Sequence, residues 1–136
     1  MNTSNAIAAK KEDPWEDAND LRWAAKHWAA RMNVRVKSVH IRPMRTKWAS
    51  ISTRGRLTLD VGVLELDREL GEYILVHELA HLLAPNHGRV FKSFLSAYLP
   101  DWEEREKRLR HLERQNLEGK FSMQATSPTG FKEFSY

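Results

Sequence analysis

The sequence predicts a single α+β domain in which one helix, a small three-stranded sheet and three further helices follow one another. Apolar residues recur at helical spacing from Leu21 to Met32, and between positions 34 and 61 their period shortens to about two residues. Beyond position 70 the apolar segments return to helical length and are separated by prolines. A chain of 136 residues that is 41% hydrophobic suits one domain with one core.

The first helix is predicted to begin at the stretch DPWE, residues 13–16. Asp13 would be the N-cap, Pro14 the first helical residue and Glu16 the acidic partner of a capping box. The buried face would be formed by the apolar residues at helical spacing, and Asn33 marks the end of the helix. The residues before this helix, 1–12, are predicted to be a disordered leader.

Three short strands are predicted next. The first spans about 34–41, with an irregularity near Ser38, and ends at Pro43. Two more, about 48–53 and 56–61, are separated by Arg54-Gly55, which is a hairpin signal. The sequence therefore predicts a small antiparallel sheet.

Three helices complete the predicted domain. The first runs from about 70 to 83 and ends at Pro85, and the second runs from about 89 to 98 and ends before Pro100. Asp101 can cap a last, highly charged helix that ends near Asn116. The domain is thus expected to span 13–118, followed by a flexible tail at 119–136.

The stretch VHELAHLLAPNHG, residues 76–88, contains the residues that predict chemistry. His77 and His81 are four residues apart on one face of a helix, so both imidazoles can bind one ion. Glu78 projects about 100° away from His77, a place that suits a carboxylate accepting a proton from bound water. Because the chain has no cysteine, any metal must be held by imidazole and carboxylate, and His87 beyond the helix stop is the natural third ligand.

Three segments in the range 42–110 together resemble the YgjP-like (WLM-related) zinc metallopeptidases of the zincin group, with SprT-like proteases as more distant relatives. They read RPMRTKWASISTRGRLTLD, EYILVHELAHLLAPNHGRVF and LPDWEEREKRLR. The resemblance implies a minimal zincin-like domain with one zinc ion per chain, held by His77, His81 and His87, and Glu78 as the catalytic acid/base. It also implies that Phe91 and Pro100-Asp101-Trp102 support the helix pair.

One segment departs from the family pattern. The family has a Trp-Gly-Ser-Cys strand, whereas this chain has Trp48-Ala49-Ser50-Ile51. Neither replaced residue is a metal ligand in that pattern, so the expected difference lies in the shape of the cleft wall. Four residues are candidates for a second group that stabilises the reacting carbonyl oxygen, and the sequence does not choose among them: His40, Arg45, Tyr73 and Tyr98.

The leading expectation is a cytoplasmic zinc-dependent endopeptidase that acts on a peptide or protein and binds it along the strand at 48–53. One alternative is a nucleic-acid-binding module in which the metal only stabilises the fold. A second alternative is a latent protease whose aromatic tail, with Phe121, Phe131, Phe134 and Tyr136, covers the cleft. No segment is apolar and long enough to predict a membrane span, and the oligomeric state is left open.

Basic residues are concentrated in one part of the chain, although the net charge is only +4. Residues 31–56 contain eight of them and no acid: Arg31, Arg35, Lys37, Arg42, Arg45, Lys47, Arg54 and Arg56. Such a segment is typical of either a solvated surface or the binding site of an anionic partner. Weak contact with nucleic acid through this segment is therefore a hypothesis, and attraction of acidic peptides is its competitor.

Overall fold

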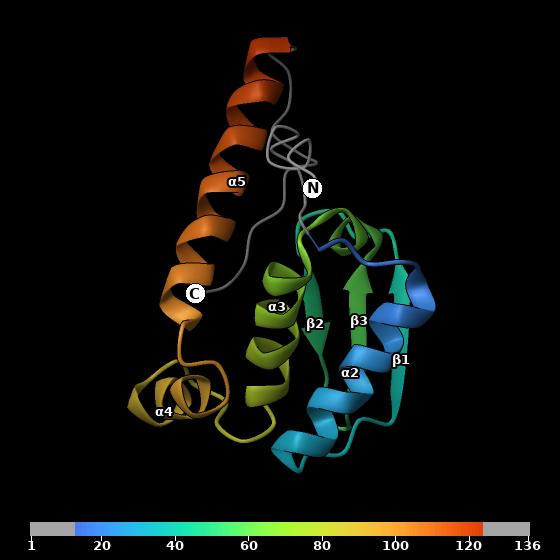
Figure 1. The fold of residues 1–136 in the computed structure, drawn as a ribbon, viewed down its shortest axis with the longest axis vertical. Helices are drawn as coiled ribbons and strands as arrows, with labels where there is room; N and C mark the ends of the chain where they lie inside the picture. The colour runs from blue at the N-terminus through green and yellow to red at the C-terminus, as the bar shows by residue number, and fades with distance from the viewer. Residues whose placement is uncertain (1–12, 124–136) are drawn as a thin grey trace, which may run out of the picture.

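The computed structural model describes residues 13–123 and shows the predicted α+β architecture (Figure 1). Side chains are described as far as residue 115. The elements in chain order are α2 (Ala18–Met32), β1 (Ser38–Arg42), β2 (Ala49–Ile51), β3 (Arg56–Asp60), the 3₁₀ helix η1 (Val61–Glu65), α3 (Arg68–Ala80), α4 (Arg89–Tyr98) and α5 (Trp102–Met123).

Helix α2 begins later than its sequence signals predicted. Its N-cap is Asp17, whose side chain accepts a hydrogen bond from the backbone N–H of Asp20 at 2.9 Å. Pro14 instead forms an isolated bridge with Asp67 just before α3. Pro14 is therefore not helical, because it pairs with a residue that is distant in the sequence and that local signals do not indicate. The predicted end is confirmed, since Asn33 is the C-cap with a left-handed φ of 57°.

The predicted antiparallel sheet is wrong in one of its two pairings. The strand order is β1-β3-β2, with β2 antiparallel and β1 parallel to β3. The predicted hairpin is confirmed between β2 and β3, where Gly55 has a φ of 88°. Alternating apolar residues specify which face of a strand is buried, but they do not specify which strand lies beside it.

The connection between β1 and β2, residues 43–48, explains the parallel pairing. Arg42 at the end of β1 and Ala49 at the start of β2 both lie at the C-terminal end of β3. Six residues at about 3.3 Å each can easily cross the roughly 10 Å between strands two positions apart. The hairpin after β2 can then place β3 between β1 and β2.

Buried Asp60 fixes this crossing connection to the end of β3. Its carboxylate accepts hydrogen bonds from the backbone N–H groups of Met44 at 2.7 Å and Gly62 at 2.8 Å. Its own N–H donates to the carbonyl of Trp48 at 2.8 Å. The segment that leads into β2 is thus anchored at both of its ends.

The helices after the sheet agree closely with their predicted positions, except at their ends. Helix α3 ends at Ala80 and the next residues form turns, so the segment predicted as helix to position 83 stops earlier. Helix α4 has its predicted bounds. Helix α5 continues past the predicted end near Asn116, so residues 119–123 of the expected tail are helical. The remainder of that tail and the predicted leader lie outside the described residues.

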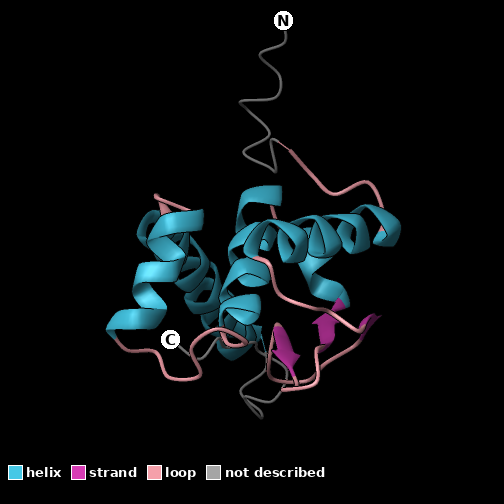
Figure 2. Cartoon of the chain, turned by 90° about the horizontal axis from the view of Figure 1, so that it is seen from below, coloured by secondary structure: helices cyan, strands magenta, loops and turns pink. Residues whose placement is uncertain are grey.

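Helices α2 and α3 pack on the same face of the sheet, with α3 at the centre of the molecule (Figures 1 and 2). Helices α4 and α5 pack on the far side of α3 from α2. The core contains the apolar residues of the inner strand face together with almost every side chain of α3. Within the described residues, no helix is both long and apolar enough to cross a membrane.

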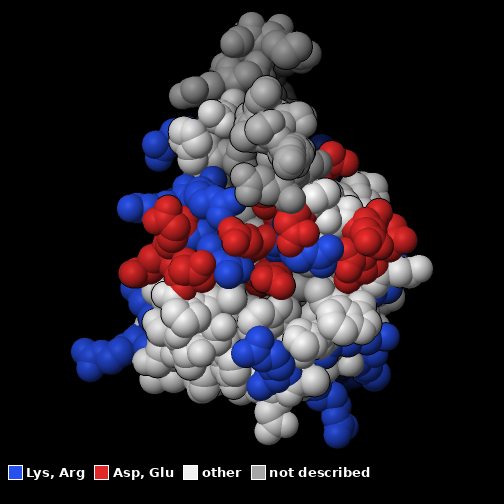
Figure 3. Space-filling model, viewed as in Figure 1, with Lys and Arg blue, Asp and Glu red and all other residues white. Residues whose placement is uncertain are grey.

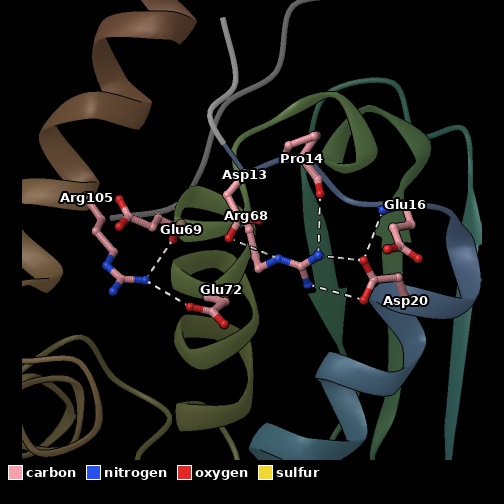
Figure 4. A network of polar contacts seen from close by, with 8 residues as sticks. All are labelled: Asp13, Pro14, Glu16, Asp20, Arg68, Glu69, Glu72 and Arg105. Atoms are coloured by element: carbon pink, nitrogen blue, oxygen red, sulfur yellow. Dashed lines mark hydrogen bonds and ion pairs between the residues drawn. The ribbon is translucent and has the colours of Figure 1, made fainter. Parts of the chain in front are cut away.

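An ion-pair network anchors the N-terminal end of α3 to α2 and to the segment before it (Figure 4). The guanidinium of Arg68 donates to both carboxylate oxygens of Asp20, at 2.8 and 3.2 Å, and lies 3.3 Å from Asp13. The hydrogen bond from Arg68 is the main reason why the pKa of Asp20 is lowered. A bidentate pair of this kind fixes geometry as well as energy.

A second set of contacts joins α3 to α5 at the same end. Arg105 donates to the carbonyl of Glu69 at 3.0 Å and to the carboxylate of Glu72 at 3.3 Å, as Figure 4 shows. One turn later along α5, Arg108 pairs with Glu69 at 2.7 Å and Asp67 at 3.1 Å. Helix α3 is therefore held from both sides, which fixes the position of the residues at its C-terminal end.

Gly71→Ala is expected to destabilise the fold by about 1–3 kcal/mol, the usual effect of overpacking. A Cβ atom at Gly71 would lie 2.6 Å from the ring of Trp15, which is buried between α3 and the Arg68 guanidinium. The better helix propensity of alanine, about 1 kcal/mol, is too small to reverse this effect. The measurement is the free energy of unfolding in denaturant.

Gly88→Ala is the matched control, because its Cβ would meet nothing within 4 Å. We expect this variant to change stability by less than about 1 kcal/mol. A Gly71→Ala variant as stable as the wild type would show that the Trp15 ring moves aside freely.

Candidate metal centre

The predicted metal ligands lie at the C-terminal end of α3 and in the turn that follows it. Val76 to Ala80 are all buried, and within this stretch His77 is 2% exposed and Glu78 7% exposed. His81 is the C-cap of the helix. Since a buried imidazole or carboxylate is costly without polar partners, this end of α3 has the character of a site rather than of ordinary core.

The three histidines come together as predicted. His77, His81 and His87 each offer a ring nitrogen, and these three atoms all lie within 4.8 Å of one another. The Nε2 atoms of His81 and His87 are 3.0 Å apart, and the ring centroids of His77 lie 5.1 and 5.0 Å from those of His81 and His87. No other group of three or more metal-binding side chains occurs among the described residues.

The turn after α3 both delivers His87 and orients His81. The N–H of Ala84 donates to the carbonyl of Ala80 at 2.8 Å, which keeps the chain turning after the helix ends. The carbonyl of Pro85 then lies 3.2 Å from Nδ1 of His81. When Nδ1 carries the proton and donates to this carbonyl, Nε2 is left as an acceptor that faces the cluster, the arrangement usual in metal-binding histidines.

Phe91 of α4 packs against all three imidazoles. Its ring centroid lies 5.0 Å from that of His77 and 4.8 Å from those of His81 and His87. The resemblance implied that this residue supports the helix pair, and its contact with every histidine is seen only in the structure. The only local signal is its place in the first turn of the helix that follows His87.

The surroundings of His77 and His81 disfavour the protonated forms of these two imidazoles. Burial lowers the pKa of His77 well below its ordinary value, and the neighbouring His81 and His87 lower it further. Burial and then His87 also lower the pKa of His81, although its bond to the carbonyl of Pro85 acts in the opposite direction. Neutral imidazole is the form that binds metal, and three imidazoles with converging nitrogens are a donor set that suits zinc.

Glu78 lies beside the histidines and is not one of the three grouped side chains. Its Oε2 atom is 3.8 Å from Nδ1 of His77. Burial raises the pKa of Glu78 to about 7, and the positive charge of Lys47 partly offsets that rise. A carboxyl group with such a pKa can gain and lose a proton near neutral pH.

Helix α5 forms two long-range hydrogen bonds through carboxylates, to Tyr73 of α3 and to Trp48 before β2, and the sequence did not predict either of them. Tyr73, one turn before His77, donates its hydroxyl to Glu106 at 3.3 Å, and its ring centroid lies 5.7 Å from that of His77. Trp48, which leads into β2, donates its indole N–H to Glu113 at 2.9 Å. Glu106 and Glu113 are two turns apart and lie on one face of α5.

The positions of two of the four candidates do not suit a second carbonyl-stabilising group. The hydroxyl of Tyr73 is directed to α5, and His40 lies on β1, which β3 separates from β2. Arg45 lies in the connection before β2 and Tyr98 is the last residue of α4. Neither Arg45 nor Tyr98 forms a hydrogen bond, ion pair or ring contact with the histidines, so the described geometry does not choose between them.

A comparison with protein families agrees with this fold and with the cluster of three histidines. Residues 16–112 match the model of the YgjP-like metallopeptidase domain. The chain belongs to the YgjP-like metallopeptidase family. All three histidines and Glu78 lie within the matched range of this family, and the chain is accordingly a metallopeptidase.

Two solved structures resemble this YgjP-like chain over most of their length. The metallopeptidase zymogen abylysin of Pyrococcus abyssi is 33% identical, with a TM-score of 0.59, over 65% of this chain and 90% of that one. The metallopeptidase zymogen jannalysin of Methanocaldococcus jannaschii is 30% identical, with a TM-score of 0.61, over 67% and 94%. No curated protein matches the sequence.

Proposed function

We propose that this YgjP-like protein is a zinc-dependent endopeptidase with one zinc ion per chain, held by His77, His81 and His87. The observation that carries the proposal is the convergence of three imidazoles at the end of a buried helix and in the turn after it, with a carboxyl group beside them. When bound, zinc would polarise the scissile carbonyl and acidify a water molecule. A metal with a purely structural role does not need that neighbouring carboxyl group.

Glu78 is the general acid/base of this proposal. Its carboxylate would accept a proton from the attacking water and donate it to the leaving amine. Burial supports both steps, because it raises the pKa of Glu78 to about 7, so that the carboxyl holds a proton more readily than an exposed glutamate does. The packing of α3 fixes the direction of the side chain.

Strand β2 is the proposed binding site for the peptide. It is an edge strand of the described sheet, and it contacts α3. A substrate in extended conformation could add to this edge by backbone hydrogen bonds, as peptides do in other proteins that recognise them by β-strand addition. The bond of Trp48 to Glu113 of α5 and the bond of Met44 to Asp60 would hold the segment that leads into this edge strand in place.

The test is cleavage of an unfolded, fluorescently labelled protein by the purified chain. We expect cleavage that a chelator abolishes and that zinc, but not magnesium, restores, because imidazole ligands suit zinc and magnesium prefers oxygen. Cleavage that continues at the same rate after the metal has been removed would contradict the proposal.

Two other functions are distinguished by the same assay. A nucleic-acid-binding module with a structural metal would bind zinc without cleaving any polypeptide. A latent protease would become active after removal of its tail, whose aromatic residues lie outside the described side chains. The buried Glu78 beside the histidines favours the endopeptidase over the first of these.

A further inference from the structure

A basic corner lies at one end of the sheet, made of Arg35, Lys37, Arg54 and Arg56. Arg35 and Lys37 precede β1, whereas Arg54 and Arg56 belong to the hairpin between β2 and β3. All four side chains are exposed. The two pairs are nearly twenty positions apart in the chain, and the parallel pairing of β1 with β3 brings both pairs to the same end of the sheet.

Backbone contacts through Gly55 hold the two segments together. The carbonyl of Gly55 accepts hydrogen bonds from the N–H groups of Lys37 at 2.8 Å and Ser38 at 3.4 Å. A Cβ atom at Gly55 would lie 2.5 Å from the carbonyl oxygen of Arg35, and the φ of 88° also favours glycine. The close approach of the four basic residues is thus a property of the folded backbone, not of flexible side chains.

The charges of the basic corner are not compensated within the described part of the chain. None of its four members forms an ion pair with another described residue, whereas Arg68, Arg105 and Arg108 are all paired with acids. Figure 3 agrees with this: acidic side chains gather with basic ones in a band across the middle of the face, whereas the charged side chains visible below that band are all Lys or Arg. The hairpin end of β3 is the lower end of the sheet in this view (Figure 1).

We propose that the basic corner binds the phosphodiester backbone of nucleic acid. Exposed cations at fixed spacing repel one another unless a polyanion binds them, and three of the four are arginines, whose planar fork suits phosphate. The surface has no group for reading bases by stacking, because the large apolar residues exposed in the described chain are Trp23, Val61 and Val90, outside the corner. Binding is therefore independent of sequence and driven by counterion release.

An acidic polypeptide is the competing occupant, and the observations favour it less. The corner follows the edge strand β2 through the hairpin, so charges on a bound peptide would reach it only at one end. It also offers no exposed large apolar side chain to anchor a peptide. This proposal does not rest on the peptidase activity, since it concerns a different surface.

The experiment is a titration of the full chain, loaded with zinc, with a fluorescently labelled mixed-sequence DNA duplex at several salt concentrations. Four phosphate contacts at −0.9 each predict a slope of about −3.6 in a plot of log K against log salt. The double variant Lys37→Gln/Arg54→Gln removes one charge from each segment, and we expect it to reduce the slope by about two units.

Arg114→Gln is the matched control, because Arg114 is an exposed arginine of α5 with no ion pair to another described residue. Its slope should equal that of the wild type, and thermal melting should show that all variants are folded. Three results would overturn the proposal: no duplex binding at low salt, an equal loss in the control, or tighter binding of poly-glutamate than of the duplex. Because binding is measured without cleavage, a failure here is separate from a failure of the endopeptidase proposal.

Discussion

Glu78→Gln is expected to lower the kcat/KM of peptide cleavage by about 10²–10⁴-fold, the usual contribution of a general acid/base. The amide has nearly the same shape as the carboxyl group but cannot accept the proton of the attacking water. Most of the loss should appear in kcat, since Glu78 is not expected to bind the ground state of the peptide. The fold and the bound metal should both be retained.

The matched control is Glu104→Gln, an exposed glutamate of α5 that forms no ion pair with a described residue. Metal content and melting temperature should be measured for both variants beside the kinetics. A Glu78→Gln variant that keeps its metal and cleaves as fast as the control would show that another group is the base. A variant that loses its metal would instead place Glu78 among the residues that hold the ion.

The sequence predicted local features well because their causes are local. The three histidines are fixed by helical spacing and by one turn at Pro85, all within eleven positions, and the structure brings them together. The bounds of α4 follow from Gly88 before it and Pro100 after it, and they are confirmed. In each case neighbouring residues alone determine the conformation.

The features that the sequence did not predict depend on distant contacts. Whether β1 pairs with β2 or with β3 is decided by the crossing connection and by Asp60, neither of which alters the apolar pattern. The first helix starts at Asp17 because Pro14 pairs with Asp67, more than fifty positions away. Strand pattern and capping signals contain no information on such partners.

The contacts of α5 show the same limit at the site itself. The bonds of Trp48 to Glu113 and of Tyr73 to Glu106 join residues 65 and 33 positions apart. In the sequence, the charged face of α5 cannot be distinguished from a solvated surface. Tyr73 and Trp48 likewise cannot be distinguished from ordinary core residues. Only the fold shows that two of the many acids on α5 bond to Tyr73, one turn before His77, and to Trp48, which leads into β2.

The second large effect is expected from His87→Ala, which should weaken zinc binding by more than about 100-fold. Loss of even an outer-shell partner of a ligand costs about 10–100-fold in affinity, and this variant removes one of the three proposed protein ligands. His87 is the best choice for the test because it is partly exposed in a turn. His77 is buried among core residues, so its replacement would also leave a cavity.

Two measurements on the His87→Ala variant separate metal binding from activity. The first is the zinc content after dialysis, with His111→Ala as control, since His111 is an exposed histidine of α5 outside the cluster. The second is the zinc dependence of the melting temperature. Zinc that binds only the folded chain stabilises it by about 2.7 kcal/mol at a hundred times its Kd, so the wild type and His111→Ala should melt at a higher temperature with zinc. His87→Ala should not respond at the same zinc concentration, and full zinc occupancy in this variant would exclude His87 as the third ligand.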